Sequence, residues 1–420
     1  MSASPLGEAP WKKKKMKSWK QTGLMVIGGG VAVVAAVVAG LFIYVNATAK
    51  PIHPDPKSVT SVTRSTPLPQ WAGAVEQGRQ IARAGLTAQN LPGLSVAVGV
   101  GGDIVWAEGF GWADLDTRAP VAPELRFRVG EVSKALTSAA VGVLLEKDRL
   151  NLDSDIQKYV PDYPEKQWPV TLRQLMGHVA GVRTDAGDEE SLESCERTVD
   201  GLPRFASASL RFEPGTQYYA SSYSWILVSA AVEAAAGEPF FTFMRTRVFE
   251  PLGMSATRPD SAKESIPDRA TFYFPRFGGD TRYGPEPARE GDQTCYAGAG
   301  AFLSTPSDLV RFGMAVSGGK LLQPATVKML QTPQRLASGE ETGYGLGWKL
   351  DTVPLAGQPT RMAGHGTKQD FIGGTTTLMT FPERGIVVAV MSNTSFADTS
   401  SVASSIAQAF AQQGKSPVPR

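Results

Sequence analysis

The sequence predicts an α+β fold in which one antiparallel sheet is flanked by helices and carries a mainly helical subdomain. Strand-like pairs occur near both ends of the chain, at residues 94–108 and 375–391, and helical segments with loops fill most of residues 132–316 between them. A composition of 42% hydrophobic and 20% charged residues is typical of a globular protein. It excludes the disordered, collagen-like and coiled-coil classes.

Each strand-like pair has the pattern of a β-hairpin. Residues 94–100 and 104–108 are apolar and β-branched, and they flank Gly101-Gly102-Asp103, a strong turn signal. Residues 375–381 and 386–391 form a similar pair around a turn that contains proline and glycine. We expect the two ends of the chain to close a single sheet.

Helices are expected to flank this sheet. The segment 71–84 has an imperfect apolar stripe at helical spacing, and residues 399–412 form a terminal helix. The folded domain is expected to span residues 71–414. Its helical insertion would cover roughly residues 146–300, and residues 415–420 would form a short tail.

The N-terminal region predicts a single membrane anchor. Residues 24–45 carry no charged side chain, and a helix of that length spans roughly 33 Å. Six lysines lie in the preceding tail, residues 1–23, so the positive-inside rule puts this tail in the cytoplasm and the domain outside, in the periplasm or extracellular space. The alternative is a signal peptide cleaved near Ala47-Thr48-Ala49, although its apolar region would be unusually long.

Residues 46–70 are rich in proline, serine and threonine, which predicts an extended linker. The lysine-rich tail accounts for more than the whole net charge of +2, so the rest of the chain offers no basic surface for nucleic acid. Cys195 and Cys295 are the two cysteines. They would form a bridge in an oxidising compartment or remain two buried thiols.

The candidate chemistry lies in residues 127–138, which open a helix that reaches about Glu146. Apolar side chains occur around most of this helix, so it should be buried on most sides. Glu131 and Lys134 are about 60° apart on a helical wheel and can meet, whereas Ser133 lies about 200° from Glu131.

The segment 127–138 resembles the first motif, F-R-x-G-S-x-S-K, of the serine β-lactamase and penicillin-binding-protein family, in its class C, esterase and D-aminopeptidase-like branch. Other matching segments follow in the family's order over about 340 residues. They are Thr171-Leu172-Arg173-Gln174-Leu175-Met176-Gly177-His178 with Ala180-Gly181, Phe212-Glu213-Pro214-Gly215-Thr216, Phe249-Glu250-Pro251-Leu252-Gly253-Met254, Phe302-Leu303-Ser304-Thr305-Pro306-Ser307-Asp308-Leu309, Tyr344-Gly345-Leu346-Gly347-Trp348 and Gly364-His365. The resemblance implies a cleft between the sheet and the helical region.

The chain departs from the family pattern at the reacting positions. Glu131 stands where the resemblance implies the nucleophilic serine, with Lys134 in the position of the base. The second motif, normally Tyr-Ser-Asn, reads Ala220-Ser221-Ser222, so the phenol that relays a proton is missing. The third motif reads His365-Gly366-Thr367, which places a side chain where the family has glycine.

These departures predict a Glu131–Lys134 ion pair that provides neither a nucleophile nor a base, because a carboxylate favours the charged ammonium. A desolvated Glu131 acting as a general base is the alternative. Ala220, Ser222 and His365 complete the candidate catalytic set.

The remaining pocket positions are Tyr219, Tyr223, Gly366 and Thr367. Tyr223 is a candidate replacement for the missing phenol, and both tyrosines also suit a packing role. His53, His178 and His365 lack the spacing of a metal site, and no cofactor is expected.

Two functions follow from this reading. One is a hydrolase of amides or esters, retained or repurposed, which intact relatives perform through an acyl-serine. The other is a catalytically silent protein that holds a small molecule, peptide or cell-wall fragment in the cleft. The predicted partners are that ligand and, through residues 24–45, the membrane. The sequence gives no indication of the oligomeric state.

Overall fold

The computed structural model describes residues 34–184, 194–366 and 372–414. The chain divides into two units, Met1–Lys50 and Pro51–Arg420. The described part of the first unit contains an apolar helix, Val34–Thr48. The predicted anchor at 24–45 therefore lies partly outside the described residues.

Among the described residues, no single helix is both long and apolar enough to cross a membrane. The helix Val34–Thr48 is apolar but shorter. Ser222–Ala236 and Phe240–Leu252 meet the length and composition requirements only together, and they are bent by 76°. The first of these two helices is buried along most of its length, which explains its apolar composition.

The second unit is built on an antiparallel sheet with the strand order β1-β3-β2-β13-β12-β11-β10, and β4 adds to β3. The predicted closure by the two chain ends is confirmed, because β13 pairs with β2 over its whole length. The strands are β1 (Ser61–Thr63), β2 (Gly93–Val100), β3 (Asp103–Asp114), β4 (Ala119–Pro120), β10 (Lys349–Leu355), β11 (Gln358–Gly366), β12 (Thr375–Phe381) and β13 (Ile386–Ser392).

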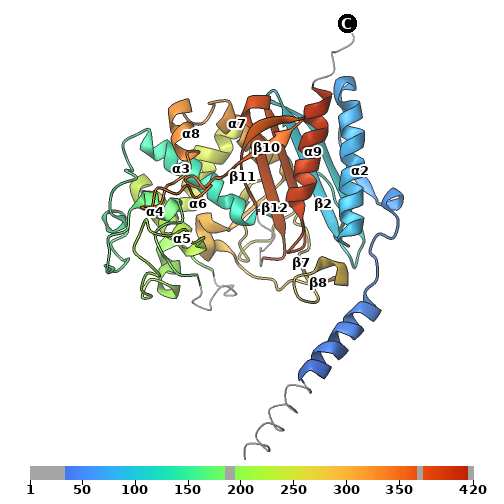
Figure 1. Cartoon of the computed structure of the whole chain (residues 1–420), viewed down its shortest axis with the longest axis horizontal. Coiled ribbons are helices and arrows are strands. Elements are labelled where there is room, and N and C mark those ends of the chain that lie inside the picture. Colours follow the sequence, from blue (N-terminus) through green and yellow to red (C-terminus); the bar gives the residue numbers. More distant parts are fainter. Residues whose placement is uncertain (1–33, 185–193, 367–371, 415–420) are drawn as a thin grey trace, which may run out of the picture. The chain divides into compact units, whose positions relative to one another are not determined.

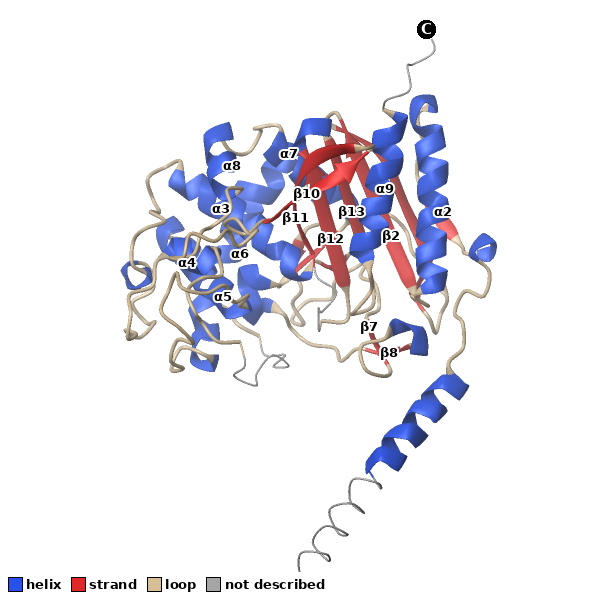
Figure 2. Ribbon diagram, viewed as in Figure 1, coloured by secondary structure: helices blue, strands red, loops and turns tan. Residues whose placement is uncertain are grey.

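Helices cover both faces of the sheet. On one face α2 (Ala72–Ala88) and α9 (Thr399–Gln413) lie side by side, as Figures 1 and 2 show. On the other face lies α7 (Pro306–Ser317), which contacts β13 and β2. Strand β13 serves both layers, since Val388 and Val390 belong to the core beneath α2 and α9, whereas Val387 and Ala389 belong to the larger core on the opposite face.

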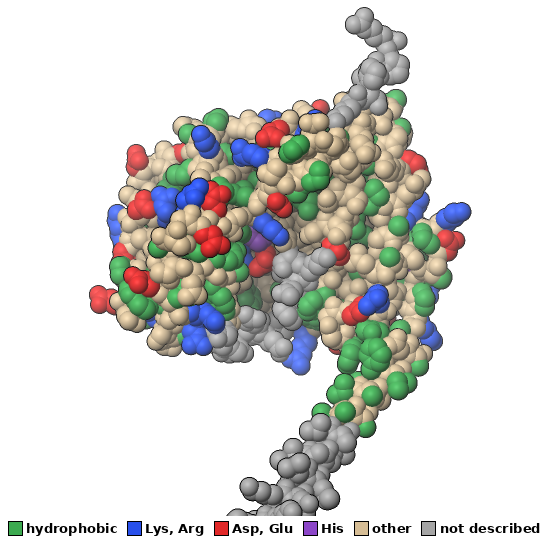
Figure 3. Space-filling view, in the orientation of Figure 1, with side chains coloured by type: hydrophobic (Ala, Val, Ile, Leu, Met, Phe, Trp, Pro, Cys, Tyr) green, Lys and Arg blue, Asp and Glu red, His purple; other side chains and the backbone are tan. Residues whose placement is uncertain are grey.

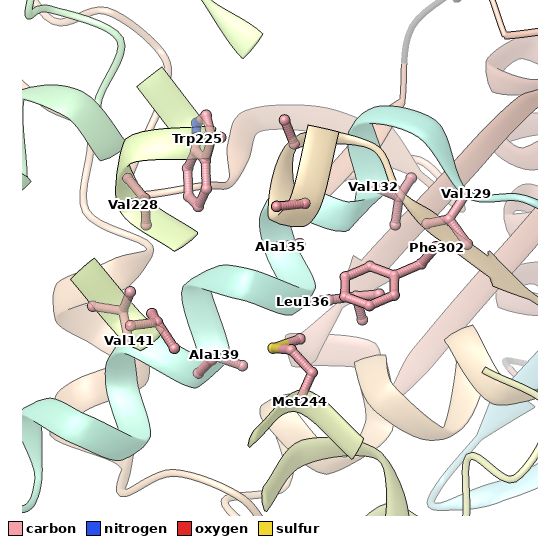
Figure 4. Packing of buried hydrophobic residues seen from close by; sticks show 14 of the residues in the cluster. Val129, Val132, Ala135, Leu136, Ala139, Val141, Trp225, Val228, Met244 and Phe302 are labelled. Atoms are coloured by element: carbon pink, nitrogen blue, oxygen red, sulfur yellow. The ribbon is translucent and has the colours of Figure 1, made fainter. Parts of the chain in front are cut away.

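The helical region beside the sheet is organised around α3 (Ser133–Leu145) and α5 (Ser222–Ala236), which contact each other. Figure 4 shows Ala135, Leu136 and Ala139 of α3 among the core side chains of Trp225, Val228, Met244 and Phe302. The other helices and strands are α4 (Leu172–Met176), α6 (Phe240–Phe243), α8 (Pro324–Leu330), β5 (Phe127–Arg128), β6 (Arg258–Pro259), β7 (Tyr273–Pro275), β8 (Pro285–Pro287) and β9 (Phe302–Ser304).

A 3₁₀ segment, η9 (Thr294–Ala299), fixes α3 against α5. The amide of Gly298 donates to Ser229 Oγ at 2.9 Å, and Thr137 Oγ1 donates to the carbonyl of Gly298 at 3.1 Å. A Cβ at Gly298 would lie 2.2 Å from Thr137 Oγ1. Only glycine permits this approach, so η9 holds the helix that carries Lys134.

Part of the expected linker is folded onto the domain. Strand β1 pairs with β3, His53 is buried, and the amide of Ile52 donates to Asn90 Oδ1 at 2.7 Å. The compact unit therefore begins at Pro51 rather than near Trp71. Proline and serine are common in linkers, but they do not prevent a short edge strand from pairing.

The cysteines form the bridge that the sequence left undecided. Cys195 and Cys295 are joined by a disulfide with a Cα–Cα distance of 4.7 Å. The bridge ties the segment that begins at residue 194 to η9 across 100 residues of sequence.

Candidate functional site

The site is built around the start of α3. A 3₁₀ turn, η3 (Gly130–Val132), follows β5 and leads directly into the helix. Glu131 lies in this turn and Lys134 lies in the first turn of α3, so both side chains are near the positive end of the helix dipole. Lys134 Nζ donates to Glu131 Oε1 at 2.6 Å, which is the ion pair expected from their spacing.

The two partners differ in exposure. The side chain of Lys134 is 1% exposed, whereas that of Glu131 is 27% exposed. Burial is the largest single effect and would raise the pKa of Glu131, but the charge and hydrogen bond of Lys134, together with the charges of His365 and His178, outweigh it and lower the pKa to about 2. Glu131 is therefore an ionised carboxylate at neutral pH, with part of its surface open to a ligand.

His365, near the end of β11, is held in one orientation. Its Nε2 lies 2.8 Å from the Tyr344 hydroxyl, and its Nδ1 accepts from the amide of Gly366 at 3.0 Å. The neutral ring therefore donates from Nε2 to Tyr344. Burial lowers the pKa of His365 to about 3, so the imidazole is uncharged at neutral pH.

His178 is hydrogen-bonded to the segment that contains the second motif. Its Nδ1 accepts from the amide of Ser221 at 3.1 Å, and its carbonyl accepts from the amide of Tyr219 at 2.9 Å. Its ring centroid lies 4.8 Å from that of Tyr344. Burial and the nearby Lys134 ammonium hold the pKa of His178 well below its ordinary value.

Two aromatic residues that the sequence analysis did not select lie close to this site. Burial and the charge of Glu131 raise the pKa of the Tyr218 phenol to about 12, although the residue is 41% exposed. Its ring centroid is 6.1 Å from that of Tyr344 and 6.0 Å from that of His178. Burial also raises the pKa of Tyr344 well above its ordinary value. Tyr218 is therefore a phenol in the electrostatic environment of Glu131.

The second-motif residues contribute little chemistry. Ala220 is exposed and offers only a methyl group, Ser221 caps α5 by accepting from the amide of Ser224 at 3.3 Å, and Ser222 is the first residue of that helix. Tyr219 turns its hydroxyl to Thr184 Oγ1 at 2.6 Å, and its ring faces the Arg211 guanidinium at 4.3 Å.

Tyr223 does not occupy the pocket expected for it. It is 1% exposed and stacks on Phe205 with ring centroids 4.6 Å apart, because it points from α5 into the apolar core. At Gly366, a Cβ would lie 2.7 Å from Thr377 Oγ1, so this glycine is required by its contact with β12. Thr367 lies outside the described residues.

Ser133 and Ser138 lie on the same helix as Lys134 and would be the nearest substitute nucleophiles in the sequence, but both are inaccessible. Ser133 is completely buried, and its Oγ has no hydrogen-bond partner in the described part of the chain. Ser138 is also buried, and its Oγ donates to the carbonyl of Leu346 at 2.5 Å. Neither hydroxyl can meet a substrate beside Lys134.

Figure 3 shows a hollow between the helical region and the sheet, where histidine, basic and acidic side chains reach the surface. Across residues 34–184, 194–366 and 372–414, no group of three or more His, Cys, Asp or Glu side chains is placed to hold a metal ion. The described site thus offers one ion pair, two neutral histidines and two phenols.

We predict that Glu131→Gln lowers the free energy of unfolding by about 2 kcal/mol, because it leaves the buried Lys134 ammonium without a counter-ion. The double variant Glu131→Gln, Lys134→Met should recover most of this loss, since both charges are then absent. Urea unfolding measures both effects. The exposed Glu124→Gln is the control and should cost less than about 0.5 kcal/mol. A Glu131→Gln variant as stable as that control would contradict the interpretation.

We predict that the domain loses stability as the pH falls below about 6.5. The pKa of His365 is about 3 in the folded state, so the unfolded chain binds the proton first, and stability is complete only above the unfolded pKa. The effect of this group is up to roughly 1 kcal/mol per pH unit.

Urea unfolding at pH 7.5 and pH 5 tests this dependence. His365→Gln should reduce it, whereas Tyr344→Phe, which keeps the imidazole, should preserve it. Equal pH dependence in His365→Gln and the unaltered chain would refute the assignment to His365.

The chain is similar to known proteins of one family. The family model described as Beta-lactamase matches residues 79–412. The human mitochondrial serine beta-lactamase-like protein LACTB is 26% identical over 466 residues, covering 85% of this chain and 84% of that protein. Penicillin-binding protein 4* of Bacillus subtilis (strain 168) is 28% identical over 283 residues, covering 64% of this chain and 62% of its own length.

Solved structures agree with the fold. A D-amino acid amidase from Ochrobactrum anthropi SV3 superposes with a TM-score of 0.68 at 21% identity, covering 82% of this chain and 99% of the amidase. A class C beta-lactamase gives a TM-score of 0.66 at 17% identity, covering 79% and 95% of the two chains. With its sheet, its helical region and the match across residues 79–412, the chain belongs to the beta-lactamase family.

Proposed function

We propose that this member of the serine beta-lactamase-like hydrolase family does not form an acyl-serine and instead uses its cleft to bind a ligand. The observation that carries the proposal is the hydrogen-bonded ion pair between Lys134 Nζ and Glu131 Oε1, which lie 2.6 Å apart. Glu131 stands at the position where the family motif has its attacking serine.

Acyl transfer in this family requires a hydroxyl and a lysine able to take its proton. Here Lys134 donates a hydrogen bond to the Glu131 carboxylate. The motif therefore has neither the attacking hydroxyl nor a lysine free to take its proton. Removing the nucleophile of a different serine hydrolase lowers turnover about 10⁶-fold. We infer a comparable loss of the family reaction in this chain.

A new role for Glu131 as a general base is less well supported. A base that works near neutral pH needs a raised pKa, whereas the Lys134 ammonium lowers the pKa of Glu131 to about 2. The carboxylate suits a different task, because its 27% exposure lets it accept a hydrogen bond from a bound ligand.

The ligand that best fits this site carries an amide or ammonium group. An N–H donor would meet the Glu131 carboxylate, and the exposed Tyr218 ring would contact the apolar part of the ligand. The similar amidase was solved with L-phenylalanine amide, and two similar Bacillus subtilis proteins are named as penicillin-binding proteins. A peptide or amino-acid amide is therefore the proposed class.

We predict that the unaltered chain gains no covalent label from a fluorescent penicillin or a fluorophosphonate, because Ser133 and Ser138, the serines on the helix of Lys134, are buried. L-Phenylalanine amide should nevertheless raise its thermal midpoint. The double variant Glu131→Ser, Ala220→Tyr should become labelled, since it restores the hydroxyl and the phenol of the motifs.

Adding Lys134→Met to that double variant is the matched control, and it should abolish the labelling. Covalent labelling of the unaltered chain would overturn the proposal, and loss of that label in Ser133→Ala would assign the reaction to Ser133. A folded double variant that stays unlabelled would also count against the motif alignment.

We further propose that the N-terminal segment anchors the protein in a membrane with the domain outside the cytoplasm. In the described part of this segment most of the large apolar side chains are exposed, including Val34, Val38 and Leu41. The Cys195–Cys295 disulfide supports an oxidising compartment. The similar LACTB proteins are named as mitochondrial.

We predict that the full chain sediments with membranes, resists a high-salt wash and is released by detergent. Val34→Lys with Val38→Lys should move it to the soluble fraction, because a lysine near the centre of a membrane helix costs about 2.5–3.5 kcal/mol. Thr48→Lys, at the last residue of the apolar helix and beyond the predicted span 24–45, is the control and should leave the protein in the membrane. A mature protein that begins after Ala49 would instead establish a cleaved signal peptide.

A further inference from the structure

A second pocket lies apart from the Glu131 site. It has a volume of about 560 Å³ and is lined by residues 261–262, 264–266, 269–272 and 287–291 together with Arg128 of β5. Glu131, Lys134 and His365 are not among its lining residues. Its size falls in the range of small-molecule sites in proteins.

The floor of this pocket is an arginine with incomplete pairing. The side chain of Arg128 is 3% exposed, and its Nε donates to Asp260 Oδ2 at 2.6 Å. Its Nη1 donates to the carbonyl of Ile372. Its Nη2 is buried and has no hydrogen-bond partner among the described residues. A buried guanidinium donor without a partner is uncommon, because its desolvation is not compensated.

The charge at the floor is also incompletely balanced. Arg269 shares the same counter-ion, since its Nη2 lies 3.0 Å from Asp260 Oδ1. Both guanidinium groups lie over the ring of Phe272, at 4.4 Å for Arg128 and 4.9 Å for Arg269. One carboxylate therefore serves two cations on an aromatic surface, and one positive charge is left for another partner.

The opening of the pocket has a different character. Glu264, Ser265, Arg289 and Glu290 line it and are exposed. Glu290 also acts on Arg128 through its charge, but it lies at the rim, where water screens it. A ligand would meet cations at the depth of the pocket and a mixed polar rim at its mouth.

We propose that this pocket binds a small organic carboxylate whose anionic end lies against Arg128 and Arg269. A guanidinium is suited to this role, because its planar donors match the two oxygens of a carboxylate and it remains charged when buried. The polar part of the ligand would face the serines and the mixed charges of the rim. Inorganic phosphate shares the negative charge but lacks the planar pair of oxygens.

The test compares N-acetylglycine with N-acetylglycinamide, which differ at the carboxylate, and with inorganic phosphate. Calorimetric titration of the full chain should show saturable binding of N-acetylglycine and at least about tenfold weaker binding of the other two probes. Arg269→Gln should weaken N-acetylglycine binding about tenfold or more. Ser265→Trp, an exposed position at the mouth, should block entry without altering the core.

Arg282→Gln is the matched control, because Arg282 is 71% exposed, pairs with Asp280 and does not line the pocket. It should bind N-acetylglycine as the unaltered chain does. Binding that survives both Arg269→Gln and Ser265→Trp would overturn the site, and so would the absence of saturable binding. Equal binding of the amide, or preferential binding of phosphate, would overturn the carboxylate assignment.

Discussion

The chemistry of this protein depends on how one buried ammonium is neutralised. Lys134 enters the core at the first turn of α3 with 1% of its side chain exposed, and an unpaired charge there would be costly. Glu131 supplies the counter-charge from the preceding turn at 2.6 Å. In the motif alignment proposed above, that carboxylate also takes the position of the family nucleophile, so the ion pair that stabilises the buried lysine would replace the acylating hydroxyl.

The Glu131–Lys134 ion pair also affects the protonation of the neighbouring histidines. With a cation already present, a second one nearby is unfavourable, and both burial and Lys134 hold the pKa values of His178 and His365 low. The two rings therefore act as neutral hydrogen-bonding groups, one toward the backbone of Ser221 and one toward Tyr344. The site has a fixed polarity, with a single ion pair inside a shell of neutral aromatic and polar side chains.

Much of the fold could be predicted because its signals are local. Strand β12 has the predicted bounds of 375–381, and the Glu131–Lys134 contact follows from residues three apart on a helical turn. Strand β3 continues to Asp114, beyond the predicted end at Glu108. The prediction ended too early because glycines interrupt the apolar pattern of the strand after Glu108. The pairing of Tyr344 with His365 brings together residues from separate segments, and no periodicity indicates such a contact.

The failure of Tyr223 as a site residue has a similar physical origin. Tyr218, Tyr219 and Tyr223 all lie within three residues of Ala220, so the sequence alone does not show which phenol faces the site. The N-cap at Ser221 starts α5, so Tyr223 turns into the core, where it stacks on Phe205. Tyr218 precedes that cap, stays 41% exposed and remains near Glu131.

The buried cations Lys134 and Arg128 differ in how their charges are paired. Lys134 has a dedicated carboxylate one turn away, so its charge is satisfied by the fold itself. Arg128 shares Asp260 with Arg269 and keeps one buried donor without a partner in the described residues. The neutralised Lys134–Glu131 pair attracts no further anion, whereas the two arginines that share Asp260 keep a net positive charge that an anion can balance. This difference supports the proposed anion recognition in the arginine pocket and the proposed role of Glu131 as a hydrogen-bond acceptor.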